Sequence, residues 1–288
     1  MRVFLAGATG AVGFEFARLA KAKGCLLQTL SRSPENARKL EGIANQVTVG
    51  DASTSIPNLR GVDVVVSALG APVTMGGSEK RSYREVDLKG NRNFLEAASA
   101  AGVPRFVYVS VHVEPGYSDT AYVCAHEEFV DALRRSGLSY SIIRPTGIFH
   151  AYNDFVMMAN KGMATVIGNG TARTNPVDAA DVAAEVMAVL ENGPPEVSVG
   201  GPEILTRRAI AELAFKVLGR RPRIISVPPA VFRFSARLAA LVNPRLGDLF
   251  EFATAVSLCD CIAPAVGRKR LEDHFRNIAV HEGVVNGN

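Results

Sequence analysis

The stretch that decides the fold is Gly7-Ala8-Thr9-Gly10-Ala11-Val12-Gly13, near the start of the chain. It follows a strand-like apolar run over residues 3–6 and precedes a helical pattern over residues 11–23. In such a turn the first glycine permits a tight bend, the second lets a pyrophosphate approach, and the third allows close helix packing. The helix N-terminus adds backbone N–H groups and partial positive charge. The sequence therefore predicts a dinucleotide site formed by all seven residues.

Short apolar strands and helical patterns continue to alternate as far as residue 144. Strands are expected at 26–30, 47–49, 62–67, 106–110 and 140–144, and helices at 34–40, 82–101 and 120–136. Repeated strand-helix-strand units predict an α/β fold of the Rossmann type, with a doubly wound parallel sheet.

The regular alternation weakens in the second half of the chain. We expect a dinucleotide-binding Rossmann domain over residues 1–150. A smaller α/β lobe over residues 151–288 would make the substrate pocket and interleave with the sheet around residues 171–200. Helices are expected at 153–161, 178–191, 206–218, 229–242 and 245–258, and the tail from 280 to 288 is expected to fray.

The last two of these helices are rich in apolar side chains. We interpret these side chains as core and pocket wall: Phe232, Phe234, Leu238, Leu241, Leu246, Leu249, Phe250 and Phe252. A dimer face is one alternative interpretation. Because Arg233, Arg237 and Arg245 interleave with these side chains, contact with a membrane surface is another. We do not expect that contact.

Composition places the chain among ordinary globular proteins. It has 288 residues, 48% hydrophobic and 21% charged, with a net charge of +4. Lys and Arg are spread along the chain, so no nucleic-acid partner is expected. The start lacks the long apolar stretch of a secretory signal, and no run reaches the ~20 apolar residues of a membrane span. We predict a cytoplasmic monomer or homodimer with a small-molecule substrate.

Four cysteines are present, at positions 25, 124, 259 and 261. Cys259 and Cys261 form a close pair without a second pair or flanking histidines, so we expect no metal site. Free thiols in a reducing compartment are the simpler interpretation.

The end of the second strand selects the cofactor's ribose. Ser31-Arg32-Ser33 stands where an acidic residue would hydrogen-bond the 2′-hydroxyl of NAD. Arg32 instead offers a charged fork for the 2′-phosphate of NADP, and the two serines offer hydroxyls. The sequence therefore favours NADP(H) over NAD(H).

Several segments together resemble a known superfamily. They are Gly50-Asp51, Ser67-Ala68-Leu69-Gly70, Tyr108-Val109-Ser110 and the run from Ala125 to Asp181, which contains AHEEFVDALRRSGLSYSIIRPTGIF and NPVDAADVA. Over residues 1–190 the chain resembles the atypical, NmrA-like NAD(P)H-binding branch of the extended short-chain dehydrogenases/reductases. That branch includes reductases, epimerase-like members and non-catalytic redox sensors.

The resemblance implies further cofactor contacts at matching positions. These are Asp51 and Ala52 beside the adenine; Ala68, Leu69 and Gly70 along the ribose and pyrophosphate; Asn91 behind the strand ends; and Pro145, Thr146, Gly147 and Phe149 beside the nicotinamide.

The same resemblance implies a catalytic group with one departure from the family pattern. A short-chain reductase combines a serine after the fifth strand with Tyr-x-x-x-Lys on the next helix. Here Ser110 ends that strand, and Tyr122 and His126 share a helix face at i and i+4, so histidine replaces lysine. Either Tyr122 and His126 act as proton donor and relay, or the pair has been lost or rebuilt. His112 is an alternative proton donor.

These observations predict an NADPH-dependent oxidoreductase. It would transfer hydride to a carbonyl or conjugated double bond of a small, largely apolar substrate, with Tyr122 the first choice of proton donor. Two alternatives stay open: a non-catalytic NADP(H)-binding redox sensor or assembly factor, and an isomerase or epimerase that retains its nucleotide.

Overall fold

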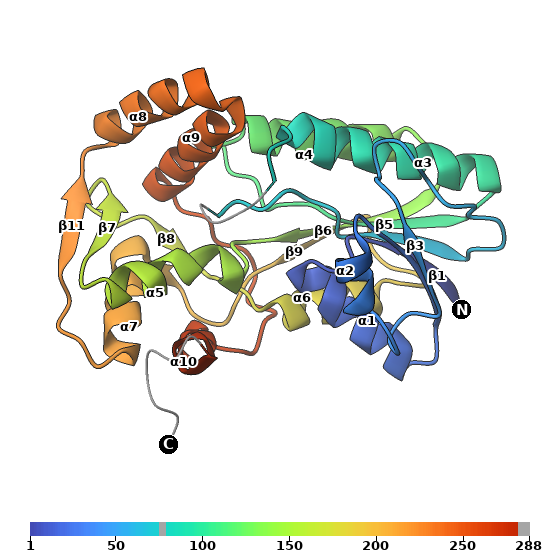
Figure 1. Cartoon of the computed structure of the whole chain (residues 1–288), viewed down its shortest axis with the longest axis horizontal. Helices are drawn as coiled ribbons and strands as arrows, with labels where there is room; N and C mark the ends of the chain where they lie inside the picture. Colours follow the sequence, from blue (N-terminus) through green and yellow to red (C-terminus); the bar gives the residue numbers. More distant parts are fainter. Residues whose placement is uncertain (75–78, 282–288) are drawn as a thin grey trace.

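A seven-stranded parallel sheet forms the centre of the molecule (Figure 1). The computed structural model describes residues 1–74 and 79–281. The strand order is β3-β2-β1-β4-β5-β6-β9. The strands are β1 Arg2–Ala6, β2 Leu26–Ser31, β3 Gln46–Val49, β4 Val64–Ser67, β5 Arg105–Val109, β6 Ser139–Pro145 and β9 Glu196–Val199. The order reverses between β1 and β4, which is the topological switch point where ligands bind in such sheets. The predicted Rossmann-type fold is confirmed.

Helices cover both faces of this sheet. α1 (Ala11–Ala22) and α6 (Ala179–Ala188) lie on one face, and α3 (Gly90–Ala101) and α4 (Ala121–Arg134) lie on the other (Figure 1). The short α2 (Pro34–Arg38) follows β2. Burial on both faces explains the uninterrupted valine run of β4, since neither side of that strand meets water.

The seventh strand, β9, was not predicted. It pairs in parallel with β6, with Ile142 opposite Glu196 and Pro145 opposite Val199. Its four residues are mostly half-exposed at the edge of the sheet, so they lack the apolar run of a central strand. β9 and α6 bring residues from the second half of the chain into the sheet.

The helix expected at 82–101 is two pieces. Residues Arg84–Lys89 form a π-helical segment, η1, and α3 begins directly after it. The wider turn of a π-helix carries an additional residue, and here Val86, Asp87 and Leu88 are all buried in succession. Apolar periodicity alone does not distinguish this arrangement from an α-helix, so the prediction of one regular helix was wrong.

A smaller lobe extends from the carboxyl edge of the sheet (Figure 1). α5 (Asn153–Asn160), α7 (Arg207–Val217) and α10 (Leu271–His281) pack around Phe149, Phe215 and Phe275. The other elements of this lobe are η2 Phe149–Tyr152, β7 Ala164–Ile167 paired with β11 Ile224–Val227, and β8 Arg173–Thr174 paired with β10 Leu205–Thr206. α10 and β11 were not predicted. Of the tail expected to fray, the first two residues belong to α10, and residues 282–288 lie outside the described part.

Two apolar helices complete the lobe, and one of them contradicts the prediction. In α9 (Pro244–Leu258), Leu249 and Phe252 are buried as expected. In α8 (Pro229–Val242), Phe234, Leu238 and Leu241 are 61%, 50% and 84% exposed, so they are not core. Small residues of α8 take the contact with α9 instead.

None of the helices in the described part of the chain is long and apolar enough to cross a membrane.

Candidate functional site

The glycine turn joins β1 to α1 at the switch point. Gly7 has φ +78°, and a Cβ there would lie 2.4 Å from the Ala68 carbonyl oxygen at the end of β4. A Cβ on Gly13 would lie 2.1 Å from the Gly7 carbonyl oxygen. Gly10 differs, because only the Gly7 oxygen, at 3.3 Å, comes within 4 Å of the position that a Cβ would take there. The protein itself therefore requires glycine at positions 7 and 13, while position 10 leaves room for a ligand.

The first turn of α1 is open to an anion. Its N-cap, Gly10, has no side-chain cap, and no acidic residue lies in the first turn. Ala8, Val12 and Gly13 are buried, Ala11 is half-buried, and Thr9 and Gly10 are exposed. The uncapped N–H groups and the helix dipole suit a pyrophosphate. The turn thus leaves the N-terminus of α1 uncapped, and its binding of a dinucleotide stays a prediction.

The position expected for the 2′-phosphate carries a chain of charges. Arg32 forms an ion pair with Glu79, and Glu79 is also paired with Arg81 at 2.9 Å. Arg81 in turn lies 2.8 Å from Asp51. Arg32 is therefore not a free cation. Sequence analysis missed Glu79 and Arg81, because they lie far along the chain from the second strand.

The remaining polar groups at this position are occupied by the protein. The Ser31 hydroxyl donates to the Ser33 carbonyl at 3.2 Å, and the Ser33 hydroxyl accepts from the Asn36 N–H as the N-cap of α2. The hydrogen bond from Arg81 lowers the pKa of Glu79 to about 2, so the acid is charged at neutral pH. For Asp51, partial burial acts to raise the pKa, and hydrogen bonds from Ser53 and the charge of Arg81 lower it on balance.

The segment after β4 lies against the glycine turn. Ala68 and Leu69 are half-buried and Gly70 is exposed. Asn91, which is fully buried, donates to the Leu69 carbonyl at 3.2 Å and accepts from the Ser67 hydroxyl. Asn91 therefore fixes the end of β4.

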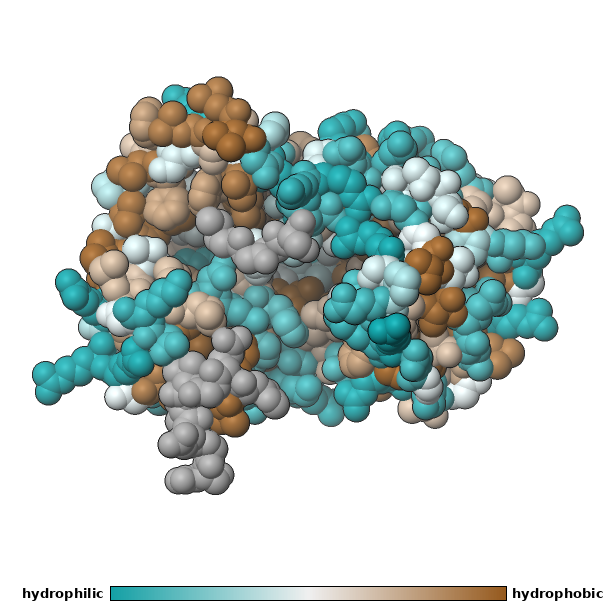
Figure 2. Space-filling view, in the orientation of Figure 1, coloured by the Kyte–Doolittle hydropathy of each residue, from teal (hydrophilic) through white to brown (hydrophobic). Residues whose placement is uncertain are grey.

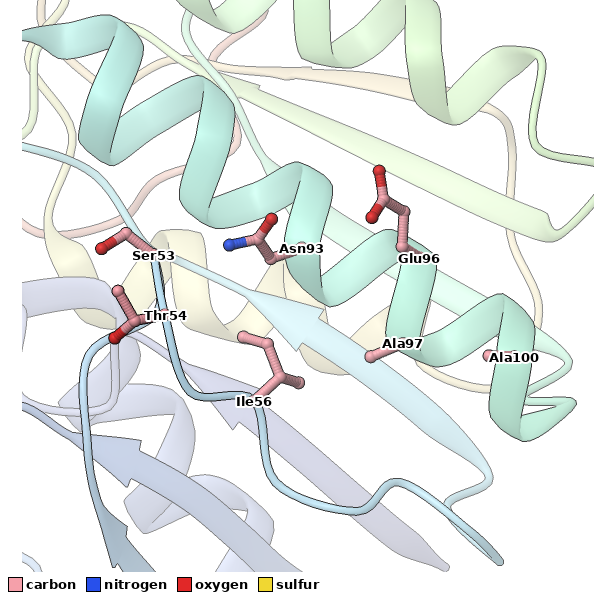
Figure 3. A pocket seen from close by; sticks show the side chains of 7 residues that line it. All are labelled: Ser53, Thr54, Ile56, Asn93, Glu96, Ala97 and Ala100. Atoms are coloured by element: carbon pink, nitrogen blue, oxygen red, sulfur yellow. The ribbon is translucent and has the colours of Figure 1, made fainter.

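A shallow cavity of about 490 Å³ lies beside the loop after β3. Figure 3 shows Asn93 and Glu96 of α3 on one side of it and Ser53, Thr54 and Ile56 on the other. The Ala52 carbonyl accepts from the Asn93 side chain at 2.9 Å. None of the predicted cofactor residues lines this cavity.

The segment after β6 is held by the small lobe. The Thr146 hydroxyl donates to the Asn175 carbonyl at 2.6 Å, and a Cβ on Gly147 would lie 2.1 Å from the Tyr152 hydroxyl. Buried Arg207 donates to that hydroxyl at 3.0 Å. The Pro145 carbonyl accepts from the His112 N–H at 2.8 Å, which joins the ends of β5 and β6.

Phe149, the last residue predicted beside the nicotinamide, is 1% exposed in the core of the small lobe.

Tyr122 lies in the first turn of α4, enclosed by rings. The ring centroids of Tyr83, His126 and Phe252 lie 5.1, 4.7 and 4.7 Å from its own. Burial, the nearby Asp87 carboxylate and Tyr83 raise the pKa of Tyr122 well above its ordinary value. This is opposite to the effect of the lysine in the family pattern.

His126 lies in the core, 3% exposed. Its Nδ1 is 2.6 Å from the Tyr108 hydroxyl. Its Nε2 is 3.3 Å from Asp87 Oδ1, although the angle gives no hydrogen bond. Sequence analysis missed Asp87 and Tyr108. The spacing of Asp87 and Asn91, i and i+4 on one helix, was the available signal.

Two polar atoms at the carboxyl end of β5 have no hydrogen-bonding partner among the described residues. They are Ser110 Oγ and His112 Nδ1, and both are buried. The other ring nitrogen of His112 lies 3.1 Å from Glu114 Oε1. Because buried polar groups are normally paired, these two atoms are available to a ligand.

Comparisons with known proteins identify a family and several relatives. The family profile described as NAD(P)H-binding matches residues 7–193. The chain is 30% identical over 261 residues to the chloroplastic divinyl chlorophyllide a 8-vinyl-reductase of Arabidopsis thaliana, covering 80% of this chain and 61% of the reductase. It is 23% identical over 237 residues to the photosystem II assembly factor Ycf39 of Cyanophora paradoxa, covering 80% and 73%. The chain thus spans less than two thirds of the reductase's length.

Solved structures share the fold. The NADPH-dependent quinone oxidoreductase QOR2 of Escherichia coli, complexed with NADPH, aligns with a TM-score of 0.71 at 18% identity, covering 96% of this chain and 99% of the other. This likeness shows the fold, and the NAD(P)H-binding family match over residues 7–193 confirms the resemblance seen in the sequence. Because the profile match extends over more than half of its length, this chain belongs to the NAD(P)H-binding family.

Proposed function

We propose that this protein is an NADPH-dependent oxidoreductase that transfers hydride to a carbonyl or conjugated double bond of a small, largely apolar substrate. The observation that carries the proposal is the pair of partnerless buried atoms, Ser110 Oγ and His112 Nδ1, at the same sheet edge as the open N-terminus of α1. NADPH, when bound, would supply the hydride. The chain must then supply orientation and a proton.

His112 has the features of a proton donor. Its Nε2 lies 3.1 Å from the Glu114 carboxylate, which orients the ring. A protonated ring donates the Nδ1 proton to the substrate oxygen or carbon, and the neutral ring is then reprotonated from water. The Ser110 hydroxyl donates a hydrogen bond to the same substrate group.

The surroundings of Tyr122 disfavour it as the proton donor. Donation by Tyr122 would leave a phenolate among Tyr83 and Phe252 with the Asp87 carboxylate nearby, and the raised pKa reflects that cost. The apolar rings around Tyr122 instead suit the wall of a pocket for an apolar substrate.

The named activity of one relative supports the double bond as the target. The relative from Arabidopsis thaliana is an 8-vinyl-reductase, so its substrate presents a carbon–carbon double bond. We extend to this chain the class of reaction, the reduction of a carbon–carbon double bond, and not the relative's substrate.

NADPH is proposed over NADH because two arginines, Arg32 and Arg81, lie where the 2′-phosphate is expected. Glu79 forms ion pairs with both arginines. The preference for NADPH therefore requires the 2′-phosphate to replace the Glu79 carboxylate between them.

The test is turnover of NADPH over a panel of ketones and enones with three proteins: wild type, His112→Gln and Tyr122→Phe. We expect His112→Gln to lower turnover by a factor of about 10² or more. NADPH affinity should stay unchanged, as measured by cofactor fluorescence. If only Tyr122→Phe shows that loss, Tyr122 is the donor and the assignment to His112 is wrong.

A second candidate is a non-catalytic NADP(H)-binding assembly factor. It is favoured by the burial of His126, which stands at the position of the family's catalytic lysine, and by the similarity to an assembly factor. It predicts tight NADPH binding without consumption over the whole panel. Bound nucleotide that survives purification, together with substrate isomerisation, would instead indicate the epimerase class.

A further inference from the structure

Residues 213–247 carry an unusual charge pattern. This stretch of 35 residues contains seven basic side chains and no acidic one. The basic residues are Lys216, Arg220, Arg221, Arg223, Arg233, Arg237 and Arg245. The seven cations sum to +7 in a chain whose net charge is +4, although Lys216 is paired with Glu272 and Arg245 is buried. We call this stretch the basic pole.

The same stretch holds five exposed large apolar side chains, including the three most exposed among the described residues. Val231, Phe234, Leu238, Leu241 and Val242 of α8 are 51%, 61%, 50%, 84% and 89% exposed. Their spacing places them on one face of α8. We call these five residues the α8 stripe. Figure 2 shows hydrophobic side chains gathered at the corner that α8 occupies in Figure 1.

The inner face of α8 explains why this stripe is outside. A Cβ on Gly247 of α9 would lie 2.6 Å from the Ala240 side chain and 3.1 Å from the Ala236 carbonyl oxygen. The two helices therefore approach through small residues, with Phe232 of α8 also packed against Phe250 of α9. The five stripe residues lie on the opposite side of α8 and are exposed. A surface helix normally has the reverse arrangement, with its large apolar side chains inside.

Two unpaired cations lie on α8 itself. Arg233 and Arg237 are exposed there. Among the described residues, no carboxylate forms an ion pair with either of them.

Arg233 and Arg237 also line a groove of about 430 Å³ between α8, α9 and the start of α4. That groove also contains three carboxylates, Asp119, Asp248 and Glu251, and none of them forms an ion pair with the two arginines. By their positions on the helix, Arg233 and Arg237 lie between the stripe and this groove.

We propose that α8 docks on an anionic lipid surface, with the stripe inserted among the acyl chains and the arginines at the headgroups. An apolar face bordered by arginines, on a helix too short to span, is the arrangement of an interfacial helix. A second copy of the chain is the less favourable occupant. A twofold contact through α8 would bring two basic poles together, and that repulsion opposes association. The proposal departs from the sequence-based expectation of no membrane contact.

Vesicle flotation of the full-length protein tests the proposal. Vesicles of phosphatidylcholine alone are compared with an equal mixture of phosphatidylcholine and phosphatidylglycerol. We expect the wild type to float with the mixed vesicles and to dissociate as salt rises. The double variant Phe234→Ser/Leu241→Ser should bind at least about tenfold less. Leu26→Ser is the matched control, since Leu26 is 51% exposed at the far end of β2 and should leave flotation unchanged.

A second variant tests the charge. Arg233→Gln/Arg237→Gln should weaken binding to the mixed vesicles about 25-fold, at about fivefold for each arginine. Unchanged thermal melting would show that all variants fold. Equal flotation of wild type and stripe variant, or no flotation of the wild type, overturns the proposal. So does a wild-type dimer in light scattering that the stripe variant dissociates, because a second copy would then cover the stripe.

Discussion

Replacing Gly10 by alanine should separate cofactor binding from folding. Gly10 has φ −77° and ψ 166°, which alanine adopts without strain. The new methyl group would meet one protein atom, the Gly7 carbonyl oxygen, at 3.3 Å. Alanine is a poorer N-cap than glycine, while it reduces the entropy of the unfolded chain. These opposing effects leave the free energy of unfolding within about 1 kcal/mol of wild type.

The effect on NADPH binding should be much larger. If the pyrophosphate rests on the first turn of α1, the methyl group displaces it by roughly the radius of a carbon atom. Charge-assisted hydrogen bonds contribute about 1.5–3 kcal/mol each, and loss of one or two amounts to about 3 kcal/mol. That loss corresponds to a Kd for NADPH about 100-fold higher.

The assay is a fluorescence titration with NADPH beside a thermal melt of the unliganded protein. Gly102→Ala serves as a control, because Gly102 has φ +69° with no heavy atom near its missing Cβ. That variant should lose about 1 kcal/mol of stability and keep its NADPH affinity. Gly7→Ala should unfold more readily, since it combines a positive φ with an overlap at Ala68. Wild-type affinity in Gly10→Ala would refute the placement of the pyrophosphate.

Three further predictions concern charged side chains. Glu79→Gln should release Arg32 and raise the ratio of NADPH affinity to NADH affinity about fivefold. The two affinities are measured in paired titrations, and an unchanged ratio would argue against a 2′-phosphate beside Arg32. Burial and His150 lower the pKa of His274 to about 4, so stability present above pH 6.5 should be lost as pH falls toward 4. Partial exposure of His274 limits this loss of stability to about 1–2 kcal/mol. In His274→Gln the melting temperature should depend less on pH between 4 and 6.5. Arg245→Met should cost about 2–3 kcal/mol in a denaturant titration, because buried Arg245 bonds two backbone carbonyls.

The doubly wound parallel sheet could be predicted from the sequence because most of its βα units carry their own local signal. Such signals can be recognised within a few residues: the glycine turn, the valine run of β4, and the helix ends at Gly102 and Gly137. β9 lacked such a signal, since an edge strand of four residues has no apolar run. The π-helical turn at Arg84–Lys89 could not be predicted either. Apolar periodicity indicates which residues are buried, but not the number of residues in each helical turn.

The candidate site was predictable where it is local and not where it depends on distant contacts. Gly7, Gly10 and Gly13 act through backbone geometry that their own neighbours determine. Arg32 illustrates the opposite case, because its partner Glu79 is 47 residues away. For α8, hydrophobicity was recognised, but which side faces the protein depends on small residues of α9, and the sequence of α8 alone does not show it.

The pairing of β9 with β6 has a consequence for how the chain folds during synthesis. The open edge of β6 is covered only when residues 196–199 have left the ribosome, after the first part of the small lobe has already emerged. That lobe in turn buries Phe149 against Phe275, close to the end of the chain. The sheet is therefore complete only after residue 199 has been made, and the small lobe only after residue 275. A nascent chain released at residue 150 would present β6 as an unpaired edge, the kind of surface that recruits other unfinished chains.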